Sequence, residues 1–271
     1  MKSKRYVDMH LHTTFSDGSS LPEQVVKDAA LLGLQVVAIT DHDNTLGYME
    51  GKRTAEEWNI ELISGVEITQ SKYHILAYGF DVENERLQEL MSLSKERQEK
   101  VMEARIKKLQ KAGIPITADL VKRLFSHPRI GSYNTIMAMM TDPVCRPYIG
   151  SLSAREINEC FFGPNGIAPK VEKEYLPLAY VIETIHNARG KAIIAHPFKQ
   201  ERDAKHLDKL VEAGIDGLEI QPNYGDKNNI FKEYALEKGL IITYGSDYHG
   251  AISSSRPMLI KGENRVLPFW Q

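Results

Sequence analysis

The sequence predicts an α/β fold built around a parallel sheet, with an all-helical insertion in its middle. Apolar strand-like runs alternate with amphipathic helix-like segments in both outer parts of the chain, and that alternation stops between them. The length supports this fold class, since 271 residues with 42% hydrophobic content can bury one large core. We therefore expect one α/β barrel domain that carries an insertion.

The first part of the chain shows the clearest alternation of strands and helices. The segment from Ser20 to Glu23 has the pattern of a capping box, with Pro22 in the first turn, and Gly33 stands where a helix-ending glycine belongs. These signals fix the first helix. We predict a strand at 6–11, a helix at 21–32, a strand at 35–39, a helix at about 46–58, and strands at 62–68 and 74–80.

The middle of the chain contains only helical segments and turns. It begins with a long charged helix at 85–112 and includes a second capping box, from Ser153 to Glu156. We place the barrel at 1–92 and 176–271 and the insertion at 93–175, and we expect the insertion to act as a lid or substrate-binding subdomain. The alternation resumes with a helix at 177–188, a strand at 192–195, a helix at 205–213, a strand at 217–220, a helix at 229–238 and a strand at 241–244.

Composition and charge exclude several classes of function. The net charge of −2 gives no general attraction to a nucleic-acid backbone, so we expect no stable nucleic-acid partner. The chain starts without the apolar core of a secretory signal, and no apolar run approaches the roughly 20 residues needed to cross a bilayer, so we expect a cytoplasmic protein without a membrane partner. Only Cys145 and Cys160 are present, so nitrogen and oxygen atoms must hold any metal. The oligomeric state cannot be read from the sequence.

Histidine and acidic residues gather where the predicted strands end. In a parallel barrel, the carboxyl ends of the strands converge on one rim. A single histidine near a strand end is usually structural, but six of the nine histidines fall there, and only His127, His186 and His206 do not. We expect those three to be structural or surface residues. The candidate rim residues are His10, His12, Asp17, Asp41, His42, Asp43, Glu67, His74, His196, Asp247 and His249.

Imidazole and carboxylate ligands without thiolates suit manganese, iron or zinc, and a shared carboxylate such as Glu67 can bridge two ions. The spacings His10-Leu11-His12 and Asp247-Tyr248-His249 place the members of each pair on one face of an extended segment. Six histidines and three carboxylates are enough for more than one ion.

The motifs that contain these residues resemble those of the PHP (polymerase and histidinol phosphatase) family, in the family's order and in both halves of the chain. The motifs are Asp8-Met9-His10-Leu11-His12-Thr13 with Ser16-Asp17-Gly18, Thr40-Asp41-His42-Asp43, Gly65-Val66-Glu67, Ala195-His196-Pro197 and Gly245-Ser246-Asp247-Tyr248-His249-Gly250. The resemblance implies a distorted (β/α)7 barrel with a trinuclear metal site. Carried over to this chain, it places His10, His12, Glu67 and Asp247 on one ion, Glu67, His74 and His196 on a second, and Asp17, His42 and His249 on a third. It also implies two or three divalent ions and a small phosphorylated substrate, attacked by a hydroxide that bridges the ions, with Asp17, His42, Glu67 and Asp247 as the catalytic residues. The candidates to bind substrate phosphate are then Arg129, Lys173, Lys199 and Arg256.

Within this family, the helical insertion and the segment Gly217-Leu218-Glu219-Ile220 are similar to a branch that includes nucleoside 3′,5′-bisphosphate phosphatases and an exoribonuclease acting from the 5′ end. That branch usually has an Arg-x-His pair in the insertion, whereas this chain has the reverse order, His127-Pro128-Arg129. The resemblance therefore implies a metal-dependent phosphoesterase for a small metabolite, with a nucleoside 3′,5′-bisphosphate as the first candidate.

Other functions stay open from the sequence. A ribose cyclic phosphate, hydrolysed at both ester bonds, and the 5′ end of an RNA are alternative substrates within the same reaction class. An amidohydrolase-type C–N hydrolase also opens with a His-x-His strand, but it predicts a bridging carbamylated lysine, and no lysine stands at the strand end that holds Glu67. A metal-binding module without catalysis ranks last, because no ligand position is visibly lost.

Overall fold

The computed structural model describes residues 5–70, 73–124, 131–169, 176–199, 203–222, 225, 229–250, 257–259, 264–266 and 269–270. The chain divides into two compact units. The first contains residues 1–92 and 176–271, and the second contains residues 93–175.

The first unit is a nearly closed α/β barrel, which confirms the predicted fold class. Its strands follow the order β7-β6-β5-β4-β3-β2-β1, and the short strand β8 pairs with β1. Neighbouring strands pair in parallel, except that β4 is antiparallel to β3 and β5, and β8 is antiparallel to β1. The strands are β1 Arg5–Leu11, β2 Val36–Ile39, β3 Glu61–Ile68, β4 Ile75–Tyr78, β5 Lys191–Ile194, β6 Gly217–Ile220, β7 Ile241–Tyr244 and β8 Arg265–Val266.

The apolar strands are buried on both faces, as expected for a sheet covered by helices. Strand β2 shows this clearly, because Val36 and Ala38 belong to a core cluster with residues of β1, β4 and β5. Its other residues, Val37 and Ile39, pack instead in a cluster with the apolar side chains of α1. Alternate residues along one strand therefore pack into the barrel interior and against the helical layer.

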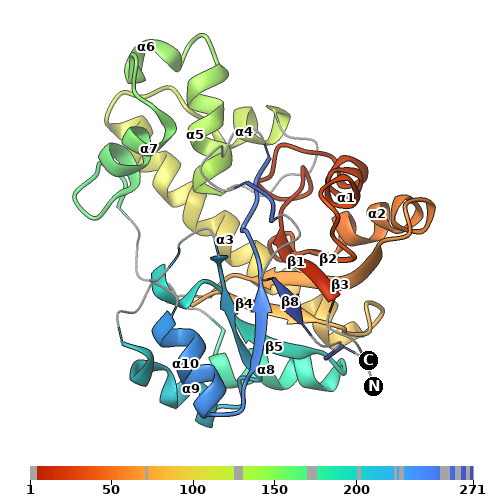
Figure 1. Cartoon of the computed structure of the whole chain (residues 1–271). Coiled ribbons are helices and arrows are strands. Elements are labelled where there is room, and N and C mark those ends of the chain that lie inside the picture. The colour runs from red at the N-terminus through yellow and green to blue at the C-terminus, as the bar shows by residue number, and fades with distance from the viewer. Residues whose placement is uncertain are drawn as a thin grey trace. The chain divides into compact units, whose positions relative to one another are not determined.

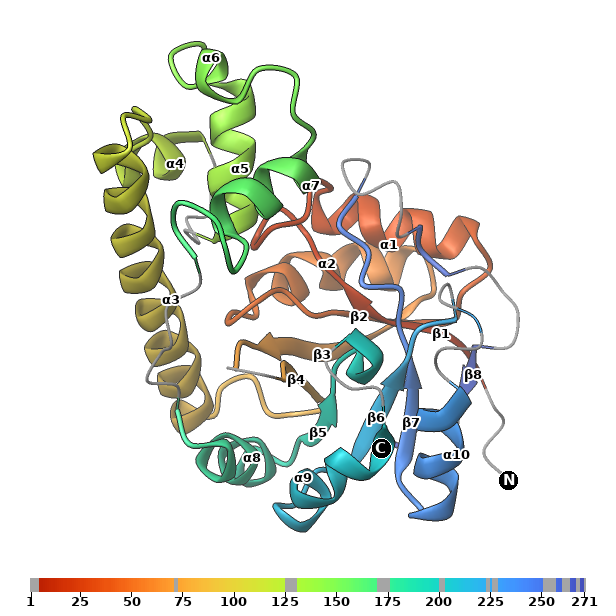
Figure 2. The ribbon, with the colours of Figure 1, turned by 90° about the vertical axis from the view of Figure 1, so that its left-hand side faces the viewer.

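Helices cover the outside of the barrel, as Figures 1 and 2 show, with α1 and α2 near β1–β3 and α8, α9 and α10 near β5–β7. The predicted capping box at Ser20 is wrong. The N-cap of α1 is Leu21 and has no side-chain cap, and the Ser20 hydroxyl lies 3.3 Å from the hydroxyl of Tyr248 instead. Gly33, with φ of 79°, follows the end of α1 as predicted. The helices are α1 Pro22–Leu31, α2 Leu46–Glu57, α8 Leu178–Asn187, α9 Asp208–Glu212 and α10 Asn229–Glu237, with 3₁₀ turns at Pro197–Lys199 and Ala204–Leu207.

The C-terminal segments close the barrel at the seam between β1 and β7. At the carboxyl end of the strands, the N–H of Tyr248 donates to the carbonyl of His10 (3.3 Å), and the N–H of His12 donates to the carbonyl of Tyr248 (2.9 Å). Nearer the other end, the N–H of Val7 donates to the carbonyl of Asn264, and the side-chain amide of Asn264 donates back to the carbonyl of Val7. The seam is thus held by hydrogen bonds to residues that follow β7.

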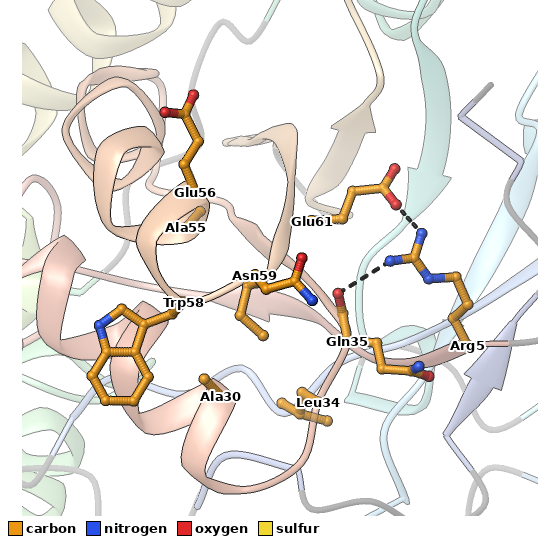
Figure 3. Close-up of a pocket in the computed structure, with 10 residues that line it drawn as sticks. Arg5, Ala30, Leu34, Gln35, Ala55, Glu56, Trp58, Asn59 and Glu61 are labelled. Carbon is orange, nitrogen blue, oxygen red and sulfur yellow. Dashed lines mark hydrogen bonds and ion pairs between the residues drawn. The ribbon is translucent and has the colours of Figure 1, made fainter.

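A surface pocket lies at the amino ends of β1–β3 (Figure 3). Arg5, at the start of β1, forms an ion pair with Glu61 at the start of β3 and donates to the carbonyl of Gln35 at 3.4 Å. Trp58 and Asn59 also line this pocket. The pocket is therefore at the opposite end of the strands from the predicted metal ligands.

The second unit has a core of its own and is built from helices and turns in its described residues. Its longest helix, α3 (Glu85–Lys111), starts in the first unit and contributes Met102, Ile106 and Leu109 to that core. The predicted capping box from Ser153 to Glu156 is present. Among the described residues, no helix is long and apolar enough to span a membrane. The other elements are α4 Ala118–Leu124, α5 Ser132–Thr141, α6 Arg146–Ile149, α7 Ala154–Ile157 and a π-helical turn at Asn158–Phe162.

Arg105 forms hydrogen bonds to three separate segments of this second unit. Its guanidinium is buried and donates to the carbonyls of Ala168 (2.8 Å) and Phe162 (2.9 Å) and to the hydroxyl of Ser132 (3.1 Å). An Arg105→Met variant leaves two buried carbonyls without this donor, so we expect the unit to lose about 3 kcal/mol of stability. Hydrogen exchange should show faster exchange of amides in residues 131–169.

The matched control for this prediction is Arg155→Met. The side chain of Arg155 is 87% exposed, and it pairs with Glu159 on the surface. Exposed ion pairs contribute little to stability, so this variant should exchange like the unchanged protein. Equal exchange in the two variants would contradict the role of Arg105.

Candidate metal centre

The structure brings the nine predicted ligand residues together at one end of the barrel. Most of them follow parallel strands, where the carboxyl ends converge. His74 is different, because it precedes β4, and β4 runs antiparallel to its neighbours. The sequence predicted a strand at 74–80 without its direction, and the reversed direction is what carries His74 to this rim. The nine residues are His10, His12, Asp17, His42, Glu67, His74, His196, Asp247 and His249.

Glu67 lies at the centre of the cluster and is fully buried. Residues that follow β2 extend the pairing to β3, since the N–H of Asp43 donates to the carbonyl of Glu67 at 3.1 Å. This pairing sets His42 beside Glu67. The Oε2 atom of Glu67 lies 3.2 Å from Nδ1 of His42, 3.3 Å from Nε2 of His12 and 3.4 Å from Nε2 of His10, and its Oε1 lies 2.8 Å from Nδ1 of His74 and 3.2 Å from Nε2 of His196.

The surroundings of Glu67 fit a divalent cation. Its Oε2 atom is buried and has no hydrogen-bond partner of normal geometry, although three imidazole nitrogens surround it. Burial would raise the pKa of Glu67, but the positive charges of His42, His74 and His10 hold it well below its usual value. A buried carboxylate that stays ionised needs positive charge around it. Two or more cations held by these nitrogens and oxygens would provide that charge.

His10 and His12 face each other across the centre, with their Nε2 atoms 3.0 Å apart. The Nδ1–H of His10 donates to Glu219 at 2.7 Å, and its Nε2 faces Glu67 at 3.4 Å. Burial lowers the pKa of His12, but hydrogen bonds to Asp247 and Glu67 outweigh burial and raise it to about 9. Both rings therefore sit where positive charge is stabilised.

Asp17, Asp247 and His249 complete the cluster. The Nδ1–H of His249 donates to the backbone carbonyl of Asp247 (2.8 Å), and its Nε2 lies 3.4 Å from Asp17. Asp247 has a left-handed backbone with φ of 57°, so a turn rather than strand alternation aims this pair. Three groups have ligand atoms close enough together to share an ion: His12, Asp17, His42 and His249; His10, His12 and Glu67; and His42, Glu67 and His74.

Two further carboxylates hold the loops that carry ligands. Asp41 accepts hydrogen bonds from the backbone N–H of Thr13 (2.8 Å) and from the hydroxyl of Ser16, next to Asp17. Asp43 accepts from the N–H (2.9 Å) and hydroxyl (2.8 Å) of Thr69. Asp43 does not cap α2, whose N-cap is Thr45.

Sequence reasoning did not assign a role in the site to Glu219. This residue is fully buried in β6, where it contacts His10 and the backbone of His196. A signal for it was present, since Glu219 is an acidic residue inside the otherwise apolar strand Gly217–Ile220. A buried carboxylate in such a strand requires polar partners.

Of the four predicted substrate-binding cations, Lys199 is placed beside the cluster, where its ammonium forms an ion pair with Asp247. Arg129, Lys173 and Arg256 lie outside the described residues, as does His127. His186 contacts Asp216 at 2.7 Å, at the amino end of β6 and away from the site. His206 is exposed, in the 3₁₀ turn that precedes α9.

Comparison with protein families and curated proteins gives a consistent assignment. The model of the PHP domain matches residues 8–223. A 5′-3′ exoribonuclease of Haemophilus influenzae is 31% identical over 99% of each chain. A phosphoribosyl 1,2-cyclic phosphate 1,2-diphosphodiesterase of Eggerthella lenta is 28% identical over 90% of this chain and 94% of its own. A 3′,5′-nucleoside bisphosphate phosphatase of Chromobacterium violaceum is 27% identical over 97% of this chain and 92% of its own.

Solved structures agree with the sequence comparison. A crystal structure of a chain named as a metal-dependent phosphoesterase, from Bifidobacterium adolescentis, superimposes with a TM-score of 0.82. It is 25% identical and covers 100% of this chain and 95% of its own. The match therefore includes both the barrel and the insertion.

Proposed function

The chain belongs to the PHP domain family, and from this premise we propose that it releases phosphate from a nucleotide, with a nucleoside 3′,5′-bisphosphate as its substrate. At the coarser level the chain is a metal-dependent phosphoesterase of this family. The similarity to the bisphosphate phosphatase extends over 97% of this chain, and the sequence motifs favour the same branch.

The observation that carries the proposal is the environment of Glu67. A buried carboxylate oxygen that is surrounded by imidazole nitrogens at 3.2–3.4 Å suits a shared ligand between two cations. The resemblance assigns Glu67 to two of the three metal positions, and this is supported by its place in two of the groups whose ligand atoms lie close enough to share an ion. Cations bound there would supply a nucleophilic water at neutral pH and offset the charge of a phosphate ester.

The side chains around the cluster have separate tasks in this proposal. Asp17, His42, Glu67 and Asp247 hold the cations, and Lys199 neutralises a substrate phosphate beside Asp247. Arg129, Lys173 and Arg256 stay sequence-based predictions of further phosphate contacts. A carboxylate at Glu67, rather than a lysine, also favours a phosphoesterase over a C–N hydrolase with a carbamylated lysine.

A second candidate is hydrolysis of RNA from its 5′ end. It is favoured by the 31% identity to the exoribonuclease over 99% of both chains. Both candidates act on a nucleotide that carries a phosphate ester, so the same cluster serves either one. The difference lies in the ester: the bisphosphate offers a phosphate monoester, which is released as inorganic phosphate, whereas RNA offers a diester whose phosphorus also carries the rest of the chain.

A substrate panel with manganese separates these candidates. The enzyme is incubated separately with adenosine 3′,5′-bisphosphate, a 5′-phosphorylated dinucleotide, ribose 1,2-cyclic phosphate 5-phosphate and an amide substrate. We expect phosphate release from the bisphosphate to be fastest, as measured by inorganic phosphate and chromatography. Faster cleavage of the dinucleotide would favour the exoribonuclease, and no cleavage of any phosphate ester would contradict the proposed function.

Lys199 offers a test of substrate binding. A Lys199→Met variant removes the ammonium beside Asp247 and keeps the aliphatic chain. We expect KM for the bisphosphate to rise about tenfold, because a charge-assisted phosphate contact is worth about 1.5 kcal/mol or more. Lys205→Met, at an exposed position in the turn before α9, is the control and should leave KM unchanged. Equal KM values in the two variants would remove Lys199 from the substrate site.

A further inference from the structure

Glu219 links two ligand residues that the family resemblance assigns to different metal positions. One of its oxygens, Oε1, accepts from the Nδ1–H of His10 at 2.7 Å. The other, Oε2, accepts from the backbone N–H of His196 at 2.7 Å. His10 belongs to the group with His12, whereas His196 contacts the opposite oxygen of Glu67. A single fully buried carboxylate thus contacts both halves of the centre.

The contact with His10 decides which nitrogen of its ring is free. A neutral imidazole has one N–H, and a carboxylate at Nδ1 fixes that hydrogen there. The Nε2 lone pair is then directed toward the centre, where His12 and Glu67 lie 3.0 and 3.4 Å away. The opposite tautomer would direct an N–H into the centre and exclude a cation from that nitrogen.

The contact with His196 holds an unusual backbone. His196 has φ of 32°, a left-handed conformation that is unfavourable for a residue with a Cβ. Its N–H is directed at the Glu219 carboxylate, and this charge-assisted hydrogen bond offsets part of the cost of that conformation. This backbone conformation places Nε2 of His196 3.2 Å from Oε1 of Glu67.

The position of the carboxylate is itself confined. A Cβ on Gly245 would lie 2.2 Å from Oε1 of Glu219 and 2.4 Å from Cβ of His10, so this space exists only because residue 245 is glycine. The amide of Gln221 donates to Oε2 at 3.2 Å. Glu219 therefore has little freedom to move away from its two partners.

We propose that Glu219 is a positioning residue that couples the two metal positions on either side of Glu67. The inference rests on the proposed function, since it assumes that the cluster binds divalent ions. A carboxylate can accept from both partners at once, whereas a glutamine side chain has one accepting oxygen. In a Glu219→Gln variant, the amide N–H₂ must face either His10, which reverses its tautomer, or the N–H of His196, which repels it. Because both rings contact the same Glu67 carboxylate, loss of either contact should disturb both positions.

The test is binding of Mn²⁺ to the metal-free protein by isothermal titration calorimetry, with metal content measured after dialysis. We expect Glu219→Gln to weaken Mn²⁺ binding about 10- to 100-fold at both positions flanking Glu67. Glu219→Asp keeps the charge but withdraws it by one methylene, and it should also weaken binding. Circular dichroism establishes that each variant is folded before the titration.

Asp216, which immediately precedes β6, provides a matched control. Its carboxylate accepts from the ring of His186 (2.7 Å) and from the backbone N–H of Ala192 (2.9 Å), the same two kinds of donor that Glu219 has, and also from Lys191 (2.9 Å). Asp216 lies at the amino end of β6, opposite the end that carries the ligand cluster. Asp216→Asn should therefore leave Mn²⁺ affinity within about twofold of the unchanged protein.

The outcomes separate the inference from the proposed function. Failure of the unchanged protein to bind Mn²⁺ would overturn both. Tight binding by the unchanged protein together with unchanged binding by the folded Glu219 variants would overturn the inference alone. Weaker binding at only one of the two positions would also overturn the coupling, because it would reduce Glu219 to a support for one ligand.

Discussion

A Glu67→Gln variant is expected to lose phosphatase activity by about a thousandfold or more. The amide keeps the size of the side chain, but it removes the negative charge that faces five imidazole rings. The amide nitrogen would also face ring nitrogens that, in the proposed function, bind a cation. If Glu67 is shared by two ions, as proposed above, its loss would weaken the binding of both ions on which the reaction depends.

The measurement is kcat/KM for adenosine 3′,5′-bisphosphate with saturating Mn²⁺. Glu61→Gln is the control, because Glu61 lies at the other end of the same strand and pairs with Arg5 near the pocket of Figure 3. That variant should keep its activity within a few-fold. Activity of Glu67→Gln within tenfold of the unchanged enzyme would contradict a central role for this carboxylate.

Removal of the metal ions is expected to abolish activity and to lower the melting temperature. A ligand at a hundredfold excess over its Kd stabilises the folded state by about 2.7 kcal/mol, so each lost ion should cost about 5 °C or more in a chain of this size. The barrel should stay folded, because protons replace part of the lost charge. Without ions, hydrogen bonds to Asp247 and Glu67 outweigh burial and raise the pKa of His12 to about 9, so its ring is protonated at neutral pH.

Dialysis against a chelator, followed by differential scanning fluorimetry and a phosphate-release assay, tests this expectation. Addition of Mn²⁺ should restore both activity and melting temperature. Dialysis of Glu67→Gln against the chelator should lower its melting temperature by less, because that variant binds fewer ions before dialysis. A chelated enzyme that stays fully active would exclude a metal-dependent reaction.

The sequence was sufficient to predict the barrel and the residues gathered at its rim. Strand ends were marked by abrupt changes from apolar runs to histidine and aspartate, and parallel strands bring such ends together without further information. Glu67 and His42 show this, since the residues after β2 keep pairing with β3 and set both side chains side by side. Local patterns and parallel geometry were enough here.

Other features depend on contacts between distant residues, which a local pattern does not encode. The direction of β4 follows from its pairing with β3 and β5, and its apolar sequence fits either direction. The partners of Glu219 lie 209 and 23 positions away, so its role appears only after the barrel closes. The capping pattern at Ser20 failed because Tyr248, from beyond β7, lies next to that hydroxyl.

The reversed direction of β4 has a consequence for the order in which the chain folds. Glu67 and His74 are only seven positions apart and meet through an antiparallel hairpin, so their contact requires a small loss of chain entropy. The contact of His10 with Glu219 instead requires a loop of 209 residues to close. We therefore expect the hairpin to form early in folding and the histidines near the seam to reach their places last. Metal added to a refolding chain should accelerate the late step and leave the early one unchanged.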